Sequence, residues 1–113
     1  MPDCLFCGIV AGDVRSEQVA TTAGSIAFRD LNPVAPTHVL VIPRRHIENA
    51  ASIHSVHAEA IADMFELANQ VAQADGLENG YRLVFNVGDD AGNSVPHLHL
   101  HVIGGRKMSW PPG

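Results

Sequence analysis

The segment HLHLHVI at residues 97–103 alternates histidine with apolar residues and constrains the fold more than any other part of the chain. Successive side chains of a β-strand point to opposite faces of a sheet, so this alternation predicts a final strand at residues 98–103, ended by the glycine pair that follows. The leucines and the valine would enter a core, while the imidazoles of His97, His99 and His101 project together, each about 7 Å from the next. Because a solvated sheet face more commonly carries Thr, Lys or Glu, the three aligned histidines favour a functional site.

The other elements that the sequence predicts fit one α+β domain over residues 1–113. The chain has 113 residues, of which 46% are apolar and 17% charged, and a chain of this size and composition can bury a core without disulfides. Short connections between consecutive strands imply an antiparallel sheet that is covered by helix on one side. Besides the final strand, the predicted elements are a helical turn at residues 4–10, a hairpin at 18–30, a strand at 37–42, one long helix at 52–75 and a strand at 81–87.

The long helix is predicted by apolar residues that recur at three- and four-residue steps. Ser52 and Ser55 are the candidate N-caps, and Gly76 follows the pattern where a C-terminal glycine is expected. The apolar positions are Ile61, Met64, Phe65, Ala68, Val71 and Ala72.

Charge and hydropathy exclude several classes of partner. Twelve Asp and Glu residues against seven Lys and Arg residues give a net charge of −5 with neutral histidines, and no segment is rich in Lys or Arg. We therefore expect neither nucleic acid nor an anionic membrane surface as partner, because both require a basic face. The apolar run VLVI at residues 39–42 is far shorter than the roughly 20 residues of a membrane span. Asp3 stands where a secretory signal would carry basic residues, so we expect a cytoplasmic protein.

The chain contains two cysteines, Cys4 and Cys7, which form one C-x-x-C pair. This spacing lets two thiolates bind a single tetrahedral zinc ion, although a zinc site needs two further ligands. A thioredoxin-like redox pair is the competing interpretation, but it expects a βαβ context that this N-terminal segment lacks. Two free thiols are the third interpretation.

The remaining polar candidates are less informative when each is taken alone. His38 lies on the predicted strand at residues 37–42, where a histidine is more often a satisfied core residue than a catalyst. His46 belongs to a loop, where imidazoles are usually solvated, and His54 and His57 near the start of the long helix are expected at the surface.

Seven features are spread along the chain: SVPHLHLHVI at residues 94–103, FRDLNP at 28–33, APTHVLVIP at 35–43, RHI at 45–47, GYR at 80–82, Asn86 and WPPG at 110–113. Taken together, they resemble the histidine-triad family of nucleotide hydrolases and transferases, and the resemblance covers nearly the whole chain. The C-terminal WPPG resembles the Hint branch, the purine nucleoside phosphoramidate hydrolases, more than the Fhit-like dinucleoside polyphosphate branch.

The resemblance implies a fold and a reaction. The implied fold is a five-stranded antiparallel sheet with one long helix and a short N-terminal helix, paired in a symmetric homodimer with an extended sheet. The implied reaction is cleavage of AMP-N (phosphoramidate) or related AMP-X bonds, in which His99 attacks the α-phosphorus and becomes a nucleotidyl-histidine. A backbone carbonyl of the triad strand would hold the proton on the other ring nitrogen of His99. The accompanying histidines, which would contact the phosphate and handle protons, are His101 and His38, and His97 is the remaining catalytic residue of the triad.

The resemblance also assigns the nucleotide contacts. Asp30 would accept hydrogen bonds from both ribose hydroxyls, although a turn-forming role before Asn32 is the simpler alternative. Phe6 and Leu31 would form the purine slot, and Trp110 would reach the site of the neighbouring subunit. The residues that would surround the phosphate are Asn86, Gly92, Asn93, Ser94 and Val95, of which Asn93 replaces the longer Gln that is usual in the family.

Bacterial members of the family complete a C-x-x-C zinc site with two histidines, and both positions are occupied here. The implied set is Cys4, Cys7, His46 and His97, a closed and therefore structural zinc site. Two other functions stay open: hydrolysis of dinucleoside polyphosphates or adenylyl sulfate, and a nucleotide-binding interaction module whose turnover is incidental.

Overall fold

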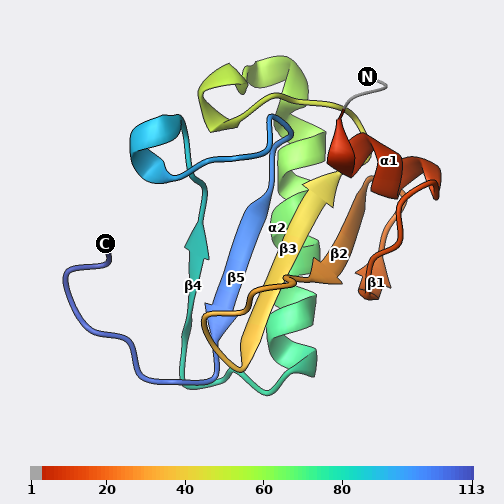
Figure 1. Ribbon diagram of the computed structural model, residues 1–113. Helices are drawn as coiled ribbons and strands as arrows, with labels where there is room; N and C mark the ends of the chain where they lie inside the picture. Colours follow the sequence, from red (N-terminus) through yellow and green to blue (C-terminus); the bar gives the residue numbers. More distant parts are fainter. Residues whose placement is uncertain (1–3) are drawn as a thin grey trace.

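A five-stranded antiparallel sheet is the centre of the computed structural model, which describes residues 4–113 (Figure 1). Within these residues the strand order is β1-β2-β3-β5-β4, which confirms the predicted fold class. Asp3, which supported the expected localisation, lies outside the described residues. The strands are β1 (Gln18–Thr21), β2 (Ser25–Arg29), β3 (Thr37–Pro43), β4 (Tyr81–Val84) and β5 (Leu100–Gly104).

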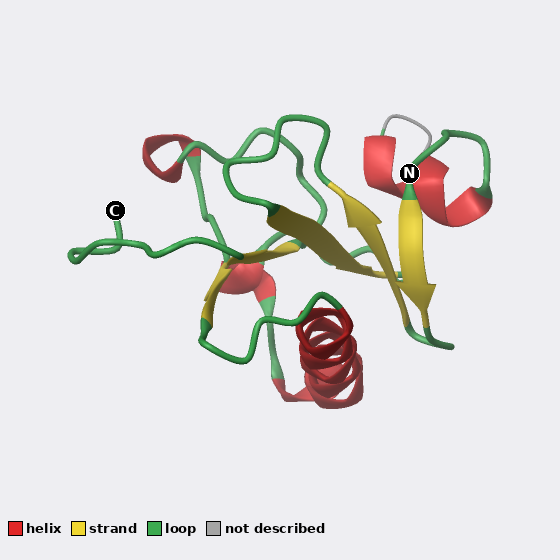
Figure 2. Ribbon diagram, turned by 90° about the horizontal axis from the view of Figure 1, so that it is seen from below, coloured by secondary structure: helices red, strands yellow, loops and turns green. Residues whose placement is uncertain are grey.

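Helices lie on both faces of the sheet. The long helix α2 (Ala58–Ala74) covers one face, and the short helix α1 (Leu5–Ala11) lies on the opposite side near β1 and β2 (Figure 2). Short 3-10 turns, η1 (Ala50–Ser52) and η2 (Ser55–His57), lead into α2, and a third, η3 (Asp89–Ala91), follows β4.

The alternation of side chains along β3 divides the apolar residues into two clusters. Val39 and Val41 pack with α2, whereas Leu40 and Ile42 point to the other face and pack with Phe6 of α1 and its neighbours. All seven residues of β3 are buried, in agreement with the apolar run VLVI at residues 39–42, which has side chains on both faces of the sheet.

The start of α2 differs from the prediction. Neither Ser52 nor Ser55 caps the helix, because His57 occupies the N-cap position and the described residues give it no side-chain cap hydrogen bond. Local hydrogen bonds wind residues 50–57 into the two 3-10 turns instead: Asn49 caps the first turn, and the His57 ring accepts from the His54 backbone N–H in the second. The C-terminal prediction is confirmed, because the glycine after the Asp75 C-cap adopts a φ of 73°.

Two strands are shorter than predicted. β4 ends at Val84 instead of residue 87, and β5 begins at Leu100 instead of residue 98. The ladder between these strands stops at the pair Val84 and His101. Before that point the Leu98 N–H donates to the loop carbonyl of Ile47, at 2.6 Å, so the first two histidines of the triad precede the regular strand.

None of the helices in the described part of the chain has the length and hydropathy required to cross a membrane.

Candidate active site and metal centre

The three triad histidines lie along one face of the extended segment at residues 97–101, as predicted. The ring centroids of His99 and His101 are 5.1 Å apart, and the Phe6 ring from α1 stands edge-on to His97 and to His99. His97 is completely buried and His99 retains 9% of its exposed area. The short N-terminal helix therefore closes over the first two imidazoles.

The hydrogen bond that His99 makes with the backbone defines its tautomer. Nδ1 of His99 lies 2.7 Å from the carbonyl oxygen of His97. A carbonyl oxygen can only accept, so Nδ1 carries the proton and donates it. Nε2 of His99 consequently holds the lone pair, as a nucleophilic imidazole requires.

A relay through His38 gives His101 the opposite polarity at Nε2. The Val34 backbone N–H donates to Nδ1 of His38 at 3.1 Å, so a neutral His38 carries its proton on Nε2. That nitrogen lies 2.9 Å from Nδ1 of His101, which therefore accepts. The proton of His101 is left on Nε2, a buried atom with no hydrogen-bond partner among residues 4–113.

Burial keeps the rings of His101 and His97 neutral near pH 7. Burial, followed by the neighbouring His99 and His38 rings, lowers the pKa of His101 to about 4, and the Asp30 carboxylate opposes this effect. Burial also lowers the pKa of His97, although its hydrogen bond with the Pro43 carbonyl opposes the change. Both imidazoles are thus available as neutral donors or ligands.

A cavity of about 340 Å³ opens beside the histidines, between α1, the end of β2 and the loop before the triad. A hollow of about 550 Å³ beside Arg106 and Lys107 is larger, but its lining includes no residue of the triad. The predicted site residues that line the smaller cavity are Phe6, Asp30, Leu31, Asn86, Gly92, Ser94, Val95, His99 and His101.

Four of the residues predicted for catalysis or nucleotide binding lie outside the lining of this cavity. His38 is buried behind His101, and His97 is turned toward the cysteines. Asn93 is partly buried, and its side-chain oxygen has no hydrogen-bond partner in the described part of the chain. Trp110 is 84% exposed on a C-terminal tail that runs away from α1, beyond β4 (Figure 1).

The loop between α1 and β1 contributes to the cavity, which the sequence did not predict. Arg15, Ser16 and Glu17 all line the cavity, and the Ser16 hydroxyl is buried without a partner among residues 4–113. From the sequence, this segment is only a connection between two predicted elements. It contains no motif that indicates a binding role.

Cys4, Cys7, His46 and His97 form the predicted cluster. Nδ1 of His97 lies 3.3 Å from the Cys4 sulfur, 3.5 Å from the Cys7 sulfur and 3.2 Å from Nδ1 of His46. Tetrahedral zinc, with bonds of about 2.0–2.3 Å to nitrogen and sulfur, places neighbouring ligands about 3.3–3.8 Å apart. The spacing and chemistry of the four donors therefore fit zinc.

Surrounding hydrogen bonds orient these donors. Nε2 of His97 donates to the Pro43 carbonyl at 2.9 Å, which leaves its Nδ1 unprotonated and free for a metal. Cys4 caps α1 by accepting from the Cys7 N–H, so the helix start aligns both thiols. Burial, and then the hydrogen bond and charge of Cys4, raise the pKa of Cys7. A bound dication would oppose these effects, because it stabilises thiolates.

His54 and His57 stay outside both sites. His54 is exposed, His57 is partly buried, and their hydrogen bond is a local one within the turn before α2.

Comparison with known proteins agrees with this geometry. The HIT family hydrolase of Legionella pneumophila superposes with a TM-score of 0.95 at 46% identity, covering 98% of this chain and 100% of that one. The histidine triad nucleotide-binding protein of Candida albicans gives a TM-score of 0.82 at 27% identity, covering 98% of this chain and 85% of that one. A 14 kDa zinc-binding protein of Zea mays is 40% identical over 111 residues, which are 96% of this chain and 87% of that protein.

The protein is thus a small α+β protein with a histidine triad and a Cys/His cluster. Residues 11–108 match the HIT domain, and the chain belongs to the HIT family.

Proposed function

We propose that this protein hydrolyses adenosine phosphoramidates, and related AMP-X compounds, through a covalent adenylyl group on His99. The observation that carries the proposal is the polarity of the two neighbouring rings. His99 offers a lone pair at Nε2, whereas His101 offers an N–H at the same atom. A nucleophile beside a hydrogen-bond donor suits attack on a phosphorus atom whose oxygens gain negative charge. The hydrolase from Legionella and the nucleotide-binding protein from Candida support the same class of chemistry.

The proposed reaction has two displacement steps. Nε2 of His99 forms a bond to the α-phosphorus, the P–N bond breaks, and the amine leaves with a proton taken from water. The carbonyl of His97 stabilises the positive charge that the His99 ring acquires, and neutral His101 donates a hydrogen bond to a phosphoryl oxygen. Water then attacks the adduct, releasing AMP and a proton and restoring neutral His99.

The nucleoside would lie in the cavity with its ribose against Asp30. Oδ1 of Asp30 accepts from the Asn32 N–H at 2.8 Å, so the residue does form the turn that was the simpler alternative. A carboxylate has about four acceptor sites, and this turn occupies one of them. Phe6 and Leu31 supply apolar surface for the base, and Gly92, with a φ of 79°, lets the loop backbone turn toward the phosphate.

Zinc would have a structural role, because four protein ligands leave no open coordination position for substrate. Cys4 and Cys7 at the start of α1 would be joined to the loop residue His46 and to His97 of the triad segment. The name of the maize relative supports zinc as the metal.

The proposal includes a symmetric homodimer. β4 is an edge strand, and the exposed Trp110 extends from the C-terminal tail. Pairing across β4 and α2 would cover this edge, and Trp110 would contribute to the leaving-group side of the neighbouring site.

A substrate panel tests the proposed reaction. Wild-type protein and His99→Ala are incubated separately with an adenosine phosphoramidate, a diadenosine polyphosphate and adenylyl sulfate, and AMP release is measured. We expect turnover of the phosphoramidate to be fastest and to require His99. Faster turnover of either other substrate would assign that reaction instead. Tight AMP binding with negligible turnover of all three would favour the interaction module.

A further inference from the structure

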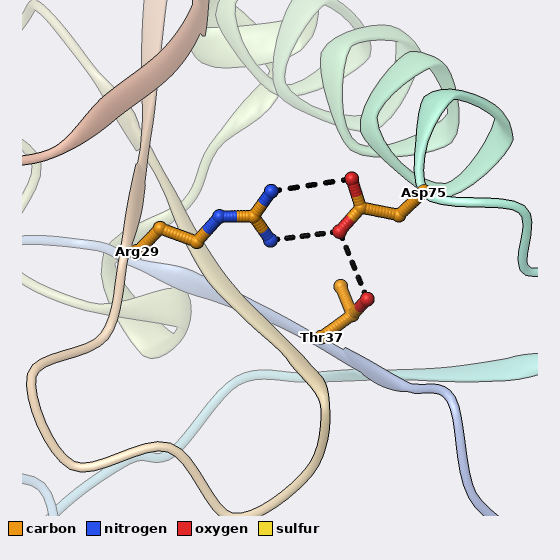
Figure 3. A network of polar contacts seen from close by, with 3 residues as sticks. All are labelled: Arg29, Thr37 and Asp75. Carbon is orange, nitrogen blue, oxygen red and sulfur yellow. Dashed lines mark hydrogen bonds and ion pairs between the residues drawn. The ribbon is translucent and has the colours of Figure 1, made fainter.

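A charged network joins the C-terminal end of α2 to the strands that carry the proposed nucleotide site. The guanidinium of Arg29 donates two hydrogen bonds to the Asp75 carboxylate, at 2.7 and 3.2 Å (Figure 3). The Thr37 hydroxyl donates a third, at 2.8 Å. Asp75 thus connects the last residue of β2 with the first residue of β3.

The position of Asp75 is unfavourable for the helix itself. Asp75 is the C-cap of α2, where the negative end of the helix dipole disfavours a carboxylate, and the last helical turn carries no basic residue. The bidentate pair with Arg29 offsets this cost, and this hydrogen bonding is the main reason that the pKa of Asp75 lies below its usual range. The Asp75 carboxylate therefore stabilises the attachment of α2 to the sheet more than it stabilises the helix itself.

The residues that contact Asp75 directly precede two site residues in the sequence. Because side chains alternate along a strand, Arg29 and Thr37 point toward α2, whereas Asp30 and His38 point to the cavity face. On that face Oδ2 of Asp30 lies 3.4 Å from Nε2 of His38. The Asp30 N–H also donates to the His38 carbonyl at 2.9 Å.

The connection between β2 and β3 provides little packing of its own. Leu31 is 94% exposed and Val34 is 55% exposed, and only one residue of the segment 31–36 is even partly buried. The Asp75 network holds these strand ends from the other face of the sheet, in addition to the backbone hydrogen bond between Asp30 and His38.

We propose that Asp75 is a positioning residue for ribonucleotides. By holding Arg29 and Thr37, it fixes the Asp30 carboxylate where both ribose hydroxyls can donate to it. This inference rests on the proposed function, since it assumes that Asp30 binds the ribose.

A matched control exists on the same helix. The Asp63 carboxylate accepts hydrogen bonds from the hydroxyls of Thr22 and Ser25, both at 2.6 Å, and so joins α2 to the turn between β1 and β2. None of these three residues lines the cavity in the described part of the chain. Asp63→Asn should therefore lower stability, as Asp75→Asn should, without changing the site.

The experiment compares AMP with 2′,3′-dideoxy-AMP by calorimetry, at a temperature well below the melting temperature of every variant. We expect Asp75→Asn to weaken AMP binding about tenfold and to leave the affinity for dideoxy-AMP unchanged. Asp63→Asn should bind both ligands like the wild type. Asp30→Ala combined with Asp75→Asn should bind AMP no more weakly than Asp30→Ala alone, because the two residues act through one contact.

Equal AMP affinities for folded Asp75→Asn and Asp63→Asn would overturn the inference, as would equal losses for the two ligands. If Asp75→Asn does not fold, Thr37→Val makes the same comparison with a smaller expected loss that is again confined to AMP. Wild-type protein that binds AMP and dideoxy-AMP equally, or Asp30→Ala with unchanged affinity, would instead refute the ribose assignment on which the inference rests.

Discussion

The imidazole of His101 should stay neutral far below the pH at which histidine ordinarily titrates. The unfolded chain binds this proton below about pH 6.5, whereas burial and the neighbouring histidines lower the pKa in the folded protein to about 4. Unfolding therefore takes up a proton between these pH values. The contribution of His101 to the free energy of unfolding therefore has its full value above about pH 6.5 and decreases as the pH falls from 6.5 to 4.

The size of the effect follows from the two pKa values. Moving the pKa from 6.5 to about 4 corresponds to about 3 kcal/mol of unfolding free energy, of which about 2 kcal/mol is lost between pH 7 and pH 5. A small domain has a total stability of roughly 5–15 kcal/mol, so the loss is measurable.

Two assays test this prediction. Nitrogen-15 NMR of labelled histidines should show a ring that titrates near pH 4, protonated on Nε2 at neutral pH and missing from His101→Gln. Urea unfolding at pH 7 and pH 5 should cost the wild type about 2 kcal/mol more than His101→Gln, and acid effects common to both proteins cancel in this comparison. A ring pKa near 6.5, or equal losses in the two proteins, would refute the burial argument and the relay through His38.

The remaining predictions address the metal, the ribose, the ion pair and the assembly. Purified protein should contain about one zinc per chain, and Cys4→Ser should lose the metal and melt at a clearly lower temperature, as elemental analysis and calorimetry would show. Asp30→Ala should weaken AMP binding by about 1.5–3 kcal/mol in titration calorimetry, and an unchanged dissociation constant would contradict the assignment. Because Arg29 keeps the pKa of Asp75 low, their pair stabilises the fold at pH values above the usual pKa of aspartate, and this contribution is lost as the pH falls through the pKa of the folded state. The free energy of unfolding of Asp75→Asn should therefore depend less on pH in the acid range than that of the wild type. Sedimentation at micromolar concentration should show a dimer, and deletion of residues 110–113 should change the preference for the leaving group.

The sequence predicted correctly those helices and strands that are determined by neighbouring residues in the chain. β3 matches the predicted strand up to Pro43 because residues 39–42 are apolar on both faces of the sheet. The helix at the N-terminus matches as well, since Cys4 caps its start and Gly12 its end. The predicted start of α2 was wrong because the side chains of Asn49 and His57 accept hydrogen bonds from backbone N–H groups in the two 3-10 turns. A serine N-cap is only one of several ways to satisfy such groups before a helix.

The candidate site was predictable where the residue types and their spacing form a motif with a known chemical role. The triad and the C-x-x-C pair have spacings that imply a common face or a common ligand, and the structure brings both sets together. Ser16 and the Asp75 network could not be predicted in this way. Ser16 lies in a connection without a pattern, and Arg29 and Asp75 meet across 46 positions of sequence through packing of the helix on the sheet.

The most direct test of the account is to trap the covalent intermediate. Wild-type protein is mixed with an adenosine phosphoramidate, quenched within one turnover, and digested for mass spectrometry. We expect one adenylyl group, located on His99, and we expect His99→Ala to bind AMP while retaining less than about 1% of wild-type turnover. An adenylyl group on another residue, or substantial turnover by His99→Ala, would contradict it.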